Sequence, residues 1–273
     1  MPSFTTGDGV RLHHLDEGDP QGRPVVLVAG FRASAAGWLY QRRALSRAGY
    51  RVLSLDRRSH GASQDPQTGH TMARHGTDLA EFLTALDLRG ALLFGSSMGT
   101  STIWSCLAQH GEDRIGGVVG LDQTPRMLAA EDWPYGFYGY TEEVRDTFFA
   151  TSIPHTGRGG TGPLRTAALV ARLLRAEGVR FAASRRGALP PHALELLHDH
   201  AVADWRAVVA ATGVPHLLVA ARRSELWPCG HAGAAAAGNP RVRAAVVEDC
   251  GHVMHLDRPR AVNRLLLDFA RSL

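Results

Sequence analysis

The sequence contains no lysine, and all 30 of its basic residues are arginines. Lysine contacts phosphates in P-loops and forms Schiff bases and Ser-Lys dyads, so its absence excludes these chemistries. The net charge is +4, but the arginines are scattered along the chain rather than gathered on one helix. Nucleic-acid binding usually needs a clustered basic face. We therefore expect no nucleic-acid partner.

Cysteine is also scarce, and there is no long hydrophobic run. The three cysteines, Cys106, Cys229 and Cys250, lie far apart and form no CxxC pair, which predicts free thiols in a reducing compartment. The N-terminal stretch has no apolar segment typical of a signal peptide. No apolar run approaches the roughly 18 residues of a membrane span. These absences predict a cytoplasmic protein with no membrane contact.

Metal-binding patterns are absent as well. His192, His198 and His200 lie close together but lack the spacing of an HExxH motif, and no Cys/His ladder suggests zinc. We interpret these histidines as exposed residues of a helix. The sequence thus predicts no metal and no cofactor.

What the sequence does contain is an alternation of strand and helix signals. Short apolar runs bounded by Gly or Asp alternate with helical periodicity, which is typical of a parallel sheet covered by helices on both faces. An N-terminal hairpin around Gly7–Gly9 is expected on one edge. The strand runs are 25–29, 50–55, 91–94, 118–121, 217–220 and 244–247.

The alternation stops between residues 123 and 213, where the chain reads as helical and rich in aromatic residues. We call residues 123–213 the cap. The predicted organisation is a core of residues 1–122 and 214–273, with the helical cap inserted before the last two strands.

The segment Gly95-Ser96-Ser97-Met98-Gly99 follows a predicted strand and opens a predicted helix. This is the context that a GxSxG nucleophile elbow requires, with glycines two residues before and after the serine because the turn is tight. Ser97 is therefore the candidate nucleophile. Its candidate base is His252, which follows Gly251 in the loop after the last strand, at the sheet edge where sites collect.

With these motifs, the chain resembles the α/β-hydrolase fold enzymes of the small serine-hydrolase type, the branch of carboxylesterases, lactonases and cofactor-free haloperoxidases. The resemblance rests on Gly30-Phe31, on the segment 56–63, on the Ser97 elbow, on Asp122 and on Gly251-His252. It implies a mostly parallel sheet of about eight strands. Two positions depart from the common pattern: Ala29 replaces the usual histidine and Ser59 a usual glycine.

The resemblance also implies further site residues. An oxyanion hole would use the backbone N–H groups of Phe31 and Met98. The acid of the family usually follows the strand at 216–221, where this chain has Ser224. Some members carry it one strand earlier, which favours Asp122, with Glu225 as the alternative acid.

The function expected from this reading is cleavage of a carboxylic ester, lactone or thioester through a Ser-His-Asp triad and an acyl-enzyme. The alternatives are a cofactor-independent oxidoreductase, either a haloperoxidase or a ring-opening dioxygenase, or a non-catalytic ligand-binding member of the fold. Trp133, Tyr138 and Trp227 are expected to line a pocket for an apolar or aromatic acyl substrate. We expect a monomer or a homodimer.

Overall fold

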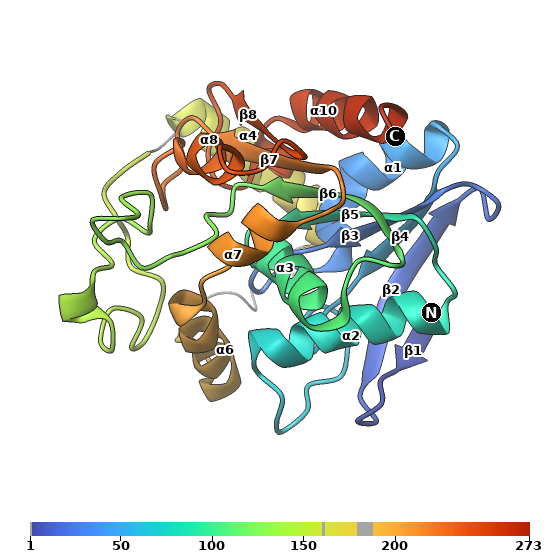
Figure 1. Ribbon diagram of the computed structural model, residues 1–273, viewed down its shortest axis with the longest axis horizontal. Helices are drawn as coiled ribbons and strands as arrows, with labels where there is room; N and C mark the ends of the chain where they lie inside the picture. Colours follow the sequence, from blue (N-terminus) through green and yellow to red (C-terminus); the bar gives the residue numbers. More distant parts are fainter. Residues whose placement is uncertain (1, 160–161, 179–187) are drawn as a thin grey trace.

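The computed structural model describes residues 2–159, 162–178 and 188–273, and its described strands form one eight-stranded sheet (Figure 1). The strand order is β1-β2-β4-β3-β5-β6-β7-β8. β2 is antiparallel to both of its neighbours, and every pair from β4 to β8 is parallel. The strands are β1 (Ser3–Thr5), β2 (Arg11–Gly18), β3 (Pro24–Val28), β4 (Arg51–Leu55), β5 (Ala91–Ser96), β6 (Ile115–Leu121), β7 (His216–Ala221) and β8 (Val242–Val247).

Helices cover both faces of this sheet, which confirms the predicted fold class (Figure 1). One face is covered by α1 and α10, and the other by α2, α3, α7 (Arg206–Ala211) and α8. The core helices are α1 (Leu39–Arg47), α2 (Met72–Ala85), α3 (Met98–His110), α8 (His231–Ala236) and α10 (Pro259–Arg271), with the short helices η1 (Ala35–Trp38) and α9 (Met254–Asp257) beside them.

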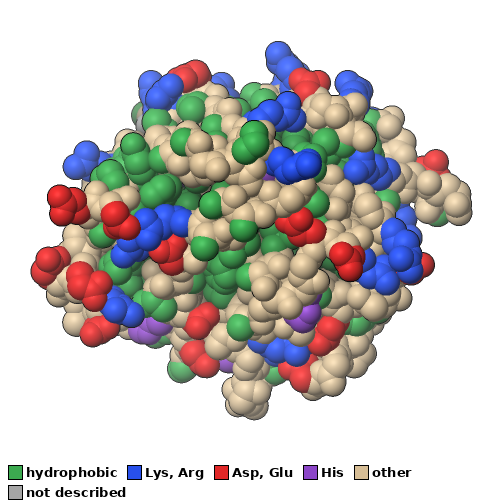
Figure 2. Space-filling model, in the orientation of Figure 1, with side chains coloured by type: hydrophobic (Ala, Val, Ile, Leu, Met, Phe, Trp, Pro, Cys, Tyr) green, Lys and Arg blue, Asp and Glu red, His purple; other side chains and the backbone are tan. Residues whose placement is uncertain are grey.

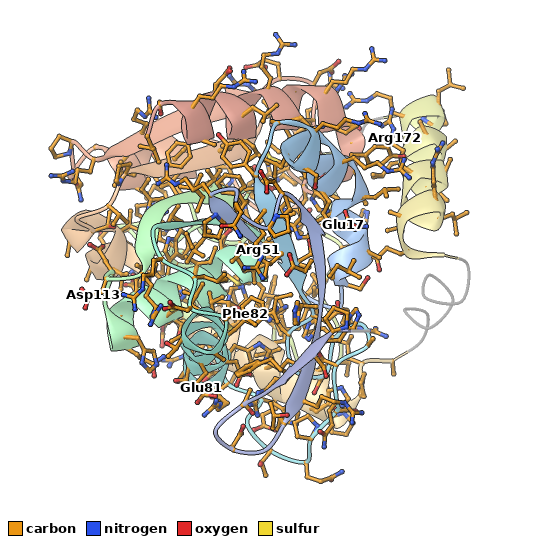
Figure 3. The ribbon with its side chains drawn as sticks, turned by 90° about the vertical axis from the view of Figure 1, so that its right-hand side faces the viewer. Glu17, Arg51, Glu81, Phe82, Asp113 and Arg172 are labelled. Carbon is orange, nitrogen blue, oxygen red and sulfur yellow. The ribbon has the colours of Figure 1, made fainter. Side chains whose placement is uncertain are left out.

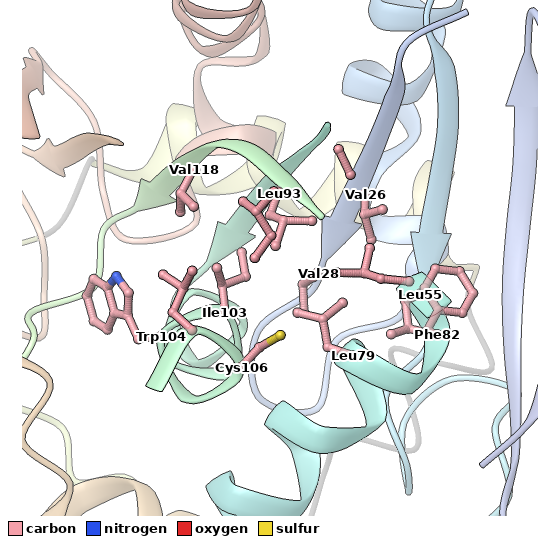
Figure 4. Packing of buried hydrophobic residues seen from close by; sticks show 14 of the residues in the cluster. Val26, Val28, Leu55, Leu79, Phe82, Leu93, Ile103, Trp104, Cys106 and Val118 are labelled. Carbon is pink, nitrogen blue, oxygen red and sulfur yellow. The ribbon is translucent and has the colours of Figure 1, made fainter. Parts of the chain in front are cut away.

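The packing of α2 shows why its sequence forms a helix here. Thr71 caps its first turn by accepting a hydrogen bond from the backbone N–H of Arg74 at 3.2 Å, as N-cap threonines do. Leu79 and Phe82 lie on one helical face and pack on Leu55 and neighbouring strand residues (Figure 4). Both side chains are fully buried. Burial of one such side chain contributes about 1.5–3 kcal/mol.

The insertion lies between β6 and β7, as the sequence predicts. Its elements are η2 (Glu142–Val144), α4 (Pro163–Glu177), α6 (Pro191–Val202) and α7 (Arg206–Ala211). Residues 160–161 and 179–187 of the cap lie outside the described part of the chain. A third apolar cluster joins cap residues such as Phe137 and Phe149 to Met98 of the core. Whether the cap is a separate domain stays a prediction.

Helix α4 is attached to the core through an arginine. Arg172, which Figure 3 labels, donates hydrogen bonds to the backbone carbonyls of Leu256 at 3.1 Å and Asp257 at 2.7 Å, so α4 lies against α9. α9 directly follows the loop that carries His252. The attachment therefore brings the cap next to the candidate site.

The surface mixes charges of both signs. Figure 2 shows acidic and basic side chains interspersed on the face it displays, with no single-sign patch. Among the residues with an assigned position, no helix combines the length and the apolar character needed to cross a membrane.

Candidate active site

Ser97 occupies a strained turn between β5 and α3. Its backbone has φ 52° and ψ −132°, a region that non-glycine residues rarely adopt. A Cβ atom at Gly95 would lie 2.5 Å from the nitrogen of Thr100, and one at Gly99 would lie 2.1 Å from the carbonyl oxygen of Val28. Only glycine fits these two positions, which is the packing that the GxSxG pattern predicts.

Asp122 lies at the same edge of the sheet, at the end of the neighbouring strand. β5 and β6 pair with Ser96 opposite Leu121, and the backbone N–H of Ser97 donates to the carbonyl of Leu121 at 2.9 Å. Asp122 itself is fully buried, with φ 45°. Two successive strand ends therefore carry Ser97 and Asp122 side by side.

The carboxylate of Asp122 is held from several directions. The imidazole Nδ1 of His252 lies 2.7 Å from its Oδ2. The hydroxyl of Ser224 donates to the same oxygen at 2.7 Å, and the backbone N–H of Ala221 donates to Oδ1 at 2.8 Å. Ser224 stands where the family usually has its acid. Here it donates a hydrogen bond to Asp122, the carboxylate that follows the preceding strand β6.

Glu225 contacts the main chain of His252. Its Oε2 accepts a hydrogen bond from the His252 backbone N–H at 2.9 Å. This contact holds the loop of residues 250–253, whereas the imidazole points to Asp122. Glu225 therefore supports the position of His252 through the backbone.

The charge of Asp122 is stabilised by two histidines. Burial by itself raises the pKa of this carboxyl, but the imidazoles of His231 and His252 beside it bring the pKa of Asp122 below its usual range. His231 Nε2, from α8, lies 3.6 Å from Asp122 Oδ1 and is buried. The carboxylate consequently stays ionised well into acid solution.

A cavity of about 360 Å³ opens beside these residues and is bordered by both Ser97 and His252. Cap residues, among them Ile153 and Leu173, form part of its wall. A smaller pocket of about 30 Å³ continues from Ser97 into the apolar cluster. A small molecule bound in the larger cavity can therefore contact both Ser97 and His252.

Phe31 and Met98 both border the smaller pocket together with Ser97. Met98 is the first residue of α3, where backbone N–H groups have no partner within the helix. A Cβ atom at Gly30 would lie only 3.2 Å from that of Ser97. The loop carrying the Phe31 N–H therefore runs against the elbow, as an oxyanion hole would require.

The three predicted pocket aromatics occupy different places. Trp227 borders the smaller pocket and packs edge-to-face on His252, with 5.3 Å between ring centroids. Trp133 donates its indole N–H to Thr124 Oγ1 and to the Arg126 carbonyl, both at 3.1 Å. Tyr138 lies under the guanidinium of Arg158. Neither Trp133 nor Tyr138 is among the described residues bordering the two cavities beside Ser97.

Sequence reasoning missed the roles of three residues near the site. Ser224 stands at the usual acid position, but nothing in the sequence indicates that its hydroxyl contacts Asp122. His231 contacts the same carboxylate and belongs to no motif. His200, interpreted above as exposed, is instead buried and borders the smaller pocket. Burial, aided by the charge of Arg57, lowers the pKa of His200 to about 3. The interpretation of His200 as exposed was wrong because α6 places the His200 side chain on its buried face.

Comparison with known proteins identifies the fold family of the chain. A sequence model described as alpha/beta hydrolase fold matches residues 23–259. A non-heme chloroperoxidase of Streptomyces lividans is 36% identical over 132 residues, 48% of each chain. The match spans about half the length of such curated relatives.

Two solved structures cover nearly the whole chain. The bromoperoxidase from Bacillus anthracis superimposes with a TM-score of 0.81 and 25% identity, covering 99% of this chain and 100% of the other. An esterase from Exiguobacterium antarcticum gives 0.79 at 22% identity, with 98% of each chain covered, which shows likeness of fold alone. The chain belongs to the alpha/beta hydrolase fold family.

Proposed function

We propose that this protein is a serine hydrolase that cleaves a carboxylic ester, lactone or thioester of a small molecule. The observation that carries the proposal is the 2.7 Å contact between His252 Nδ1 and Asp122 Oδ2, with Ser97 and His252 bordering one cavity. Ser97 would be the nucleophile, His252 the general base and Asp122 the acid that orients the base. These three parts make up a catalytic triad.

The proposed reaction follows from these parts. His252 takes the proton of the Ser97 hydroxyl as its oxygen attacks the substrate carbonyl, while Asp122 stabilises the imidazolium. The N–H groups of Phe31 and Met98 stabilise the oxyanion. His252 then protonates the leaving group, which departs and leaves an acyl-Ser97. A water molecule, deprotonated by His252, releases the acid and regenerates Ser97.

The smaller pocket supports an apolar acyl group as the substrate part nearest Ser97. Its walls include Met127, Phe137, Phe149 and Trp227. Apolar walls with a few polar groups are typical of small-molecule sites.

A second candidate function is peroxide-dependent halide oxidation, favoured by the similarity to the chloroperoxidase and the bromoperoxidase. Both functions can use the same acyl-enzyme. Attack by hydrogen peroxide in place of water would release a peracid, which oxidises a halide ion to hypohalite and becomes the carboxylic acid. Such a route needs no metal or cofactor.

One experiment tests both functions. The protein is assayed against nitrophenyl esters, lactones and acyl thioesters, and then against the same acyl donors with hydrogen peroxide and bromide. A small fluorophosphonate should label Ser97, located by mass spectrometry of the digested protein. Turnover of none of these substrates, together with no label on Ser97, would reject the acyl-enzyme and favour a ligand-binding member of the fold.

The pH dependence should show one ionisation on its acid limb. Asp122 stays charged there because its pKa is lowered, so activity should fall only as a single proton taken up by the base prevents it from accepting the Ser97 proton. The measurement is kcat/KM of a slow ester from pH 4 to 9. A rate constant that stays flat down to pH 5, or that falls with two protons, would contradict this assignment.

Trp227 and Trp133 should respond differently to replacement by alanine. Both are buried, so each variant should lose about 3–5 kcal/mol in the free energy of unfolding. Trp227→Ala enlarges the pocket beside Ser97 and should change the ranking of short against long acyl esters. Trp133→Ala should leave that ranking unchanged, because Trp133 holds the cap segment at Thr124 and Arg126. An equal change of ranking in both variants would contradict the placement.

A further inference from the structure

Arg57 lies buried beneath the loop that carries Phe31. It follows β4 in the turn after Asp56, and only 2% of its surface is exposed. Its Nε donates to the carbonyl of Ala29 at 3.1 Å, and its Nη2 donates to the carbonyl of Gly30 at 2.9 Å. One planar guanidinium therefore holds two successive carbonyls of this loop.

The carbonyl of Gly30 belongs to the same peptide unit as the N–H of Phe31. The described chain has no cis peptide bonds, so this carbonyl and this N–H point in opposite directions in one plane. Fixing the carbonyl on Arg57 also fixes the direction of the N–H. The only other backbone group donating to this oxygen among the described residues is the N–H of Ala33, at 3.2 Å.

The remaining partners of Arg57 are imidazole nitrogens. Nη1 lies 3.0 Å from His75 Nδ1, and Nη2 lies 3.0 Å from His60 Nε2. Arginine can only donate, so both ring nitrogens accept and neither carries a proton at that position. Burial, with the charge of Arg57, lowers the pKa of His75 well below its usual value. These hydrogen-bonding partners therefore bring no negative charge to Arg57.

The positive charge of Arg57 consequently has little compensation nearby. Within residues 2–159, 162–178 and 188–273, no carboxylate oxygen lies within ion-pair distance of it. The nearby Asp78 pairs instead with Arg58 and Arg74. Burial lowers the pKa of Arg57 to about 9, with only partial relief from the charge of Asp78. A buried cation of this kind acts at short range on any negative charge that forms beside the loop.

We propose that Arg57 is the positioning residue of the oxyanion hole, aiming and polarising the Phe31 N–H through the Gly30–Phe31 peptide. The proposal rests on the proposed acyl-enzyme function, and it adds a residue that contacts no substrate. Donation of a charge-assisted hydrogen bond to the carbonyl makes the N–H of the same peptide a stronger donor. The stabilisation applies to the oxyanion and not to the bound ester.

The test compares Arg57→Lys with Arg58→Lys. Arg58 is equally buried and adjacent, but it hydrogen-bonds Asp78, Asp8 and the Thr68 carbonyl, away from the oxyanion loop. Arg57→Lys should lower kcat for a nitrophenyl ester by about 10²-fold, the loss typical of removing one oxyanion donor, with KM nearly unchanged. Arg58→Lys should lower the Tm and leave kcat within about threefold.

A trifluoromethyl ketone supplies a readout that a merely structural role would not move. It adds to an active serine to form a hemiketal oxyanion, so its affinity should fall in Arg57→Lys in parallel with kcat and stay unchanged in Arg58→Lys. Unchanged kcat in Arg57→Lys, or a lower kcat with full ketone affinity, would overturn the proposal. Failure of the wild-type protein to bind the ketone would instead reject the acyl-enzyme function.

A second variant and a wild-type measurement apply if Arg57→Lys does not fold. Arg57→Gln removes the charge but keeps an amide donor, and it should show the same parallel losses. In the wild-type protein, ¹⁹F NMR of the hemiketal over a pH series should show an oxyanion that stays ionised below the range of the free ketone hydrate. An oxyanion that titrates in that ordinary range would contradict the role of Arg57.

Discussion

Replacing Ser97 by alanine should reduce kcat for ester hydrolysis by about 10⁴-fold or more, because the attacking oxygen is removed and its base has nothing to activate. The fold should tolerate the change, since alanine keeps the Cβ that already fits the turn at φ 52°. The measurement is steady-state hydrolysis of a nitrophenyl ester together with the Tm of both proteins.

Ser101→Ala provides a matched control for this variant. Ser101 is buried in α3, one turn beyond the elbow, and its hydroxyl has no hydrogen-bond partner among the described residues. Its removal should leave kcat unchanged. If Ser97→Ala keeps more than about a tenth of wild-type turnover, the covalent route is wrong and hydrolysis must use a water molecule directly.

The second large effect is expected for Asp122→Asn, with a loss of up to about 10⁴-fold in kcat. The amide keeps the shape of the carboxylate but removes the negative charge beside the forming imidazolium. Both carboxylate oxygens of Asp122 now accept hydrogen bonds, one from the Ser224 hydroxyl and one from the Ala221 N–H. The NH₂ group of the asparagine would replace one of these acceptors and would place a donor against a donor. The measurement is kcat at the pH optimum, with the Tm of both proteins as a check that the fold remains intact.

Glu225→Gln is the comparison that distinguishes the two carboxylates. A glutamine oxygen can still accept the His252 backbone N–H that Glu225 now accepts. We therefore expect a loss of less than about tenfold. An inactive Glu225→Gln beside a fully active Asp122→Asn would move the acid role to Glu225 and remove the contact on which the proposed triad depends.

Local signals in the sequence were enough to predict the sheet, the flanking helices and the elbow. Each rests on interactions between residues close in the chain, such as the apolar runs of the buried strands and the two glycines around Ser97. The position of His252 also followed from chain order, because a loop after a parallel strand emerges at the same edge as the elbow. The family resemblance added the candidate oxyanion donors Phe31 and Met98.

The placement of the other side chains depended on contacts between distant segments. Asp122 and Glu225 are both acids near strand ends, and only the fold shows that one contacts the imidazole of His252 while the other contacts its backbone. Trp133 and Trp227 are equally aromatic, yet only Trp227 borders the pocket.

Arg57 shows the same division between sequence and fold. The sequence by itself determined that an arginine follows β4 in a turn typical of the family. The fold decided that its guanidinium lies under the Gly30–Phe31 peptide, with neutral partners around it. The physical reason is that hydrogen-bond direction and charge compensation depend on atoms brought together across the sheet, whereas strand and helix formation depends on neighbours along the chain.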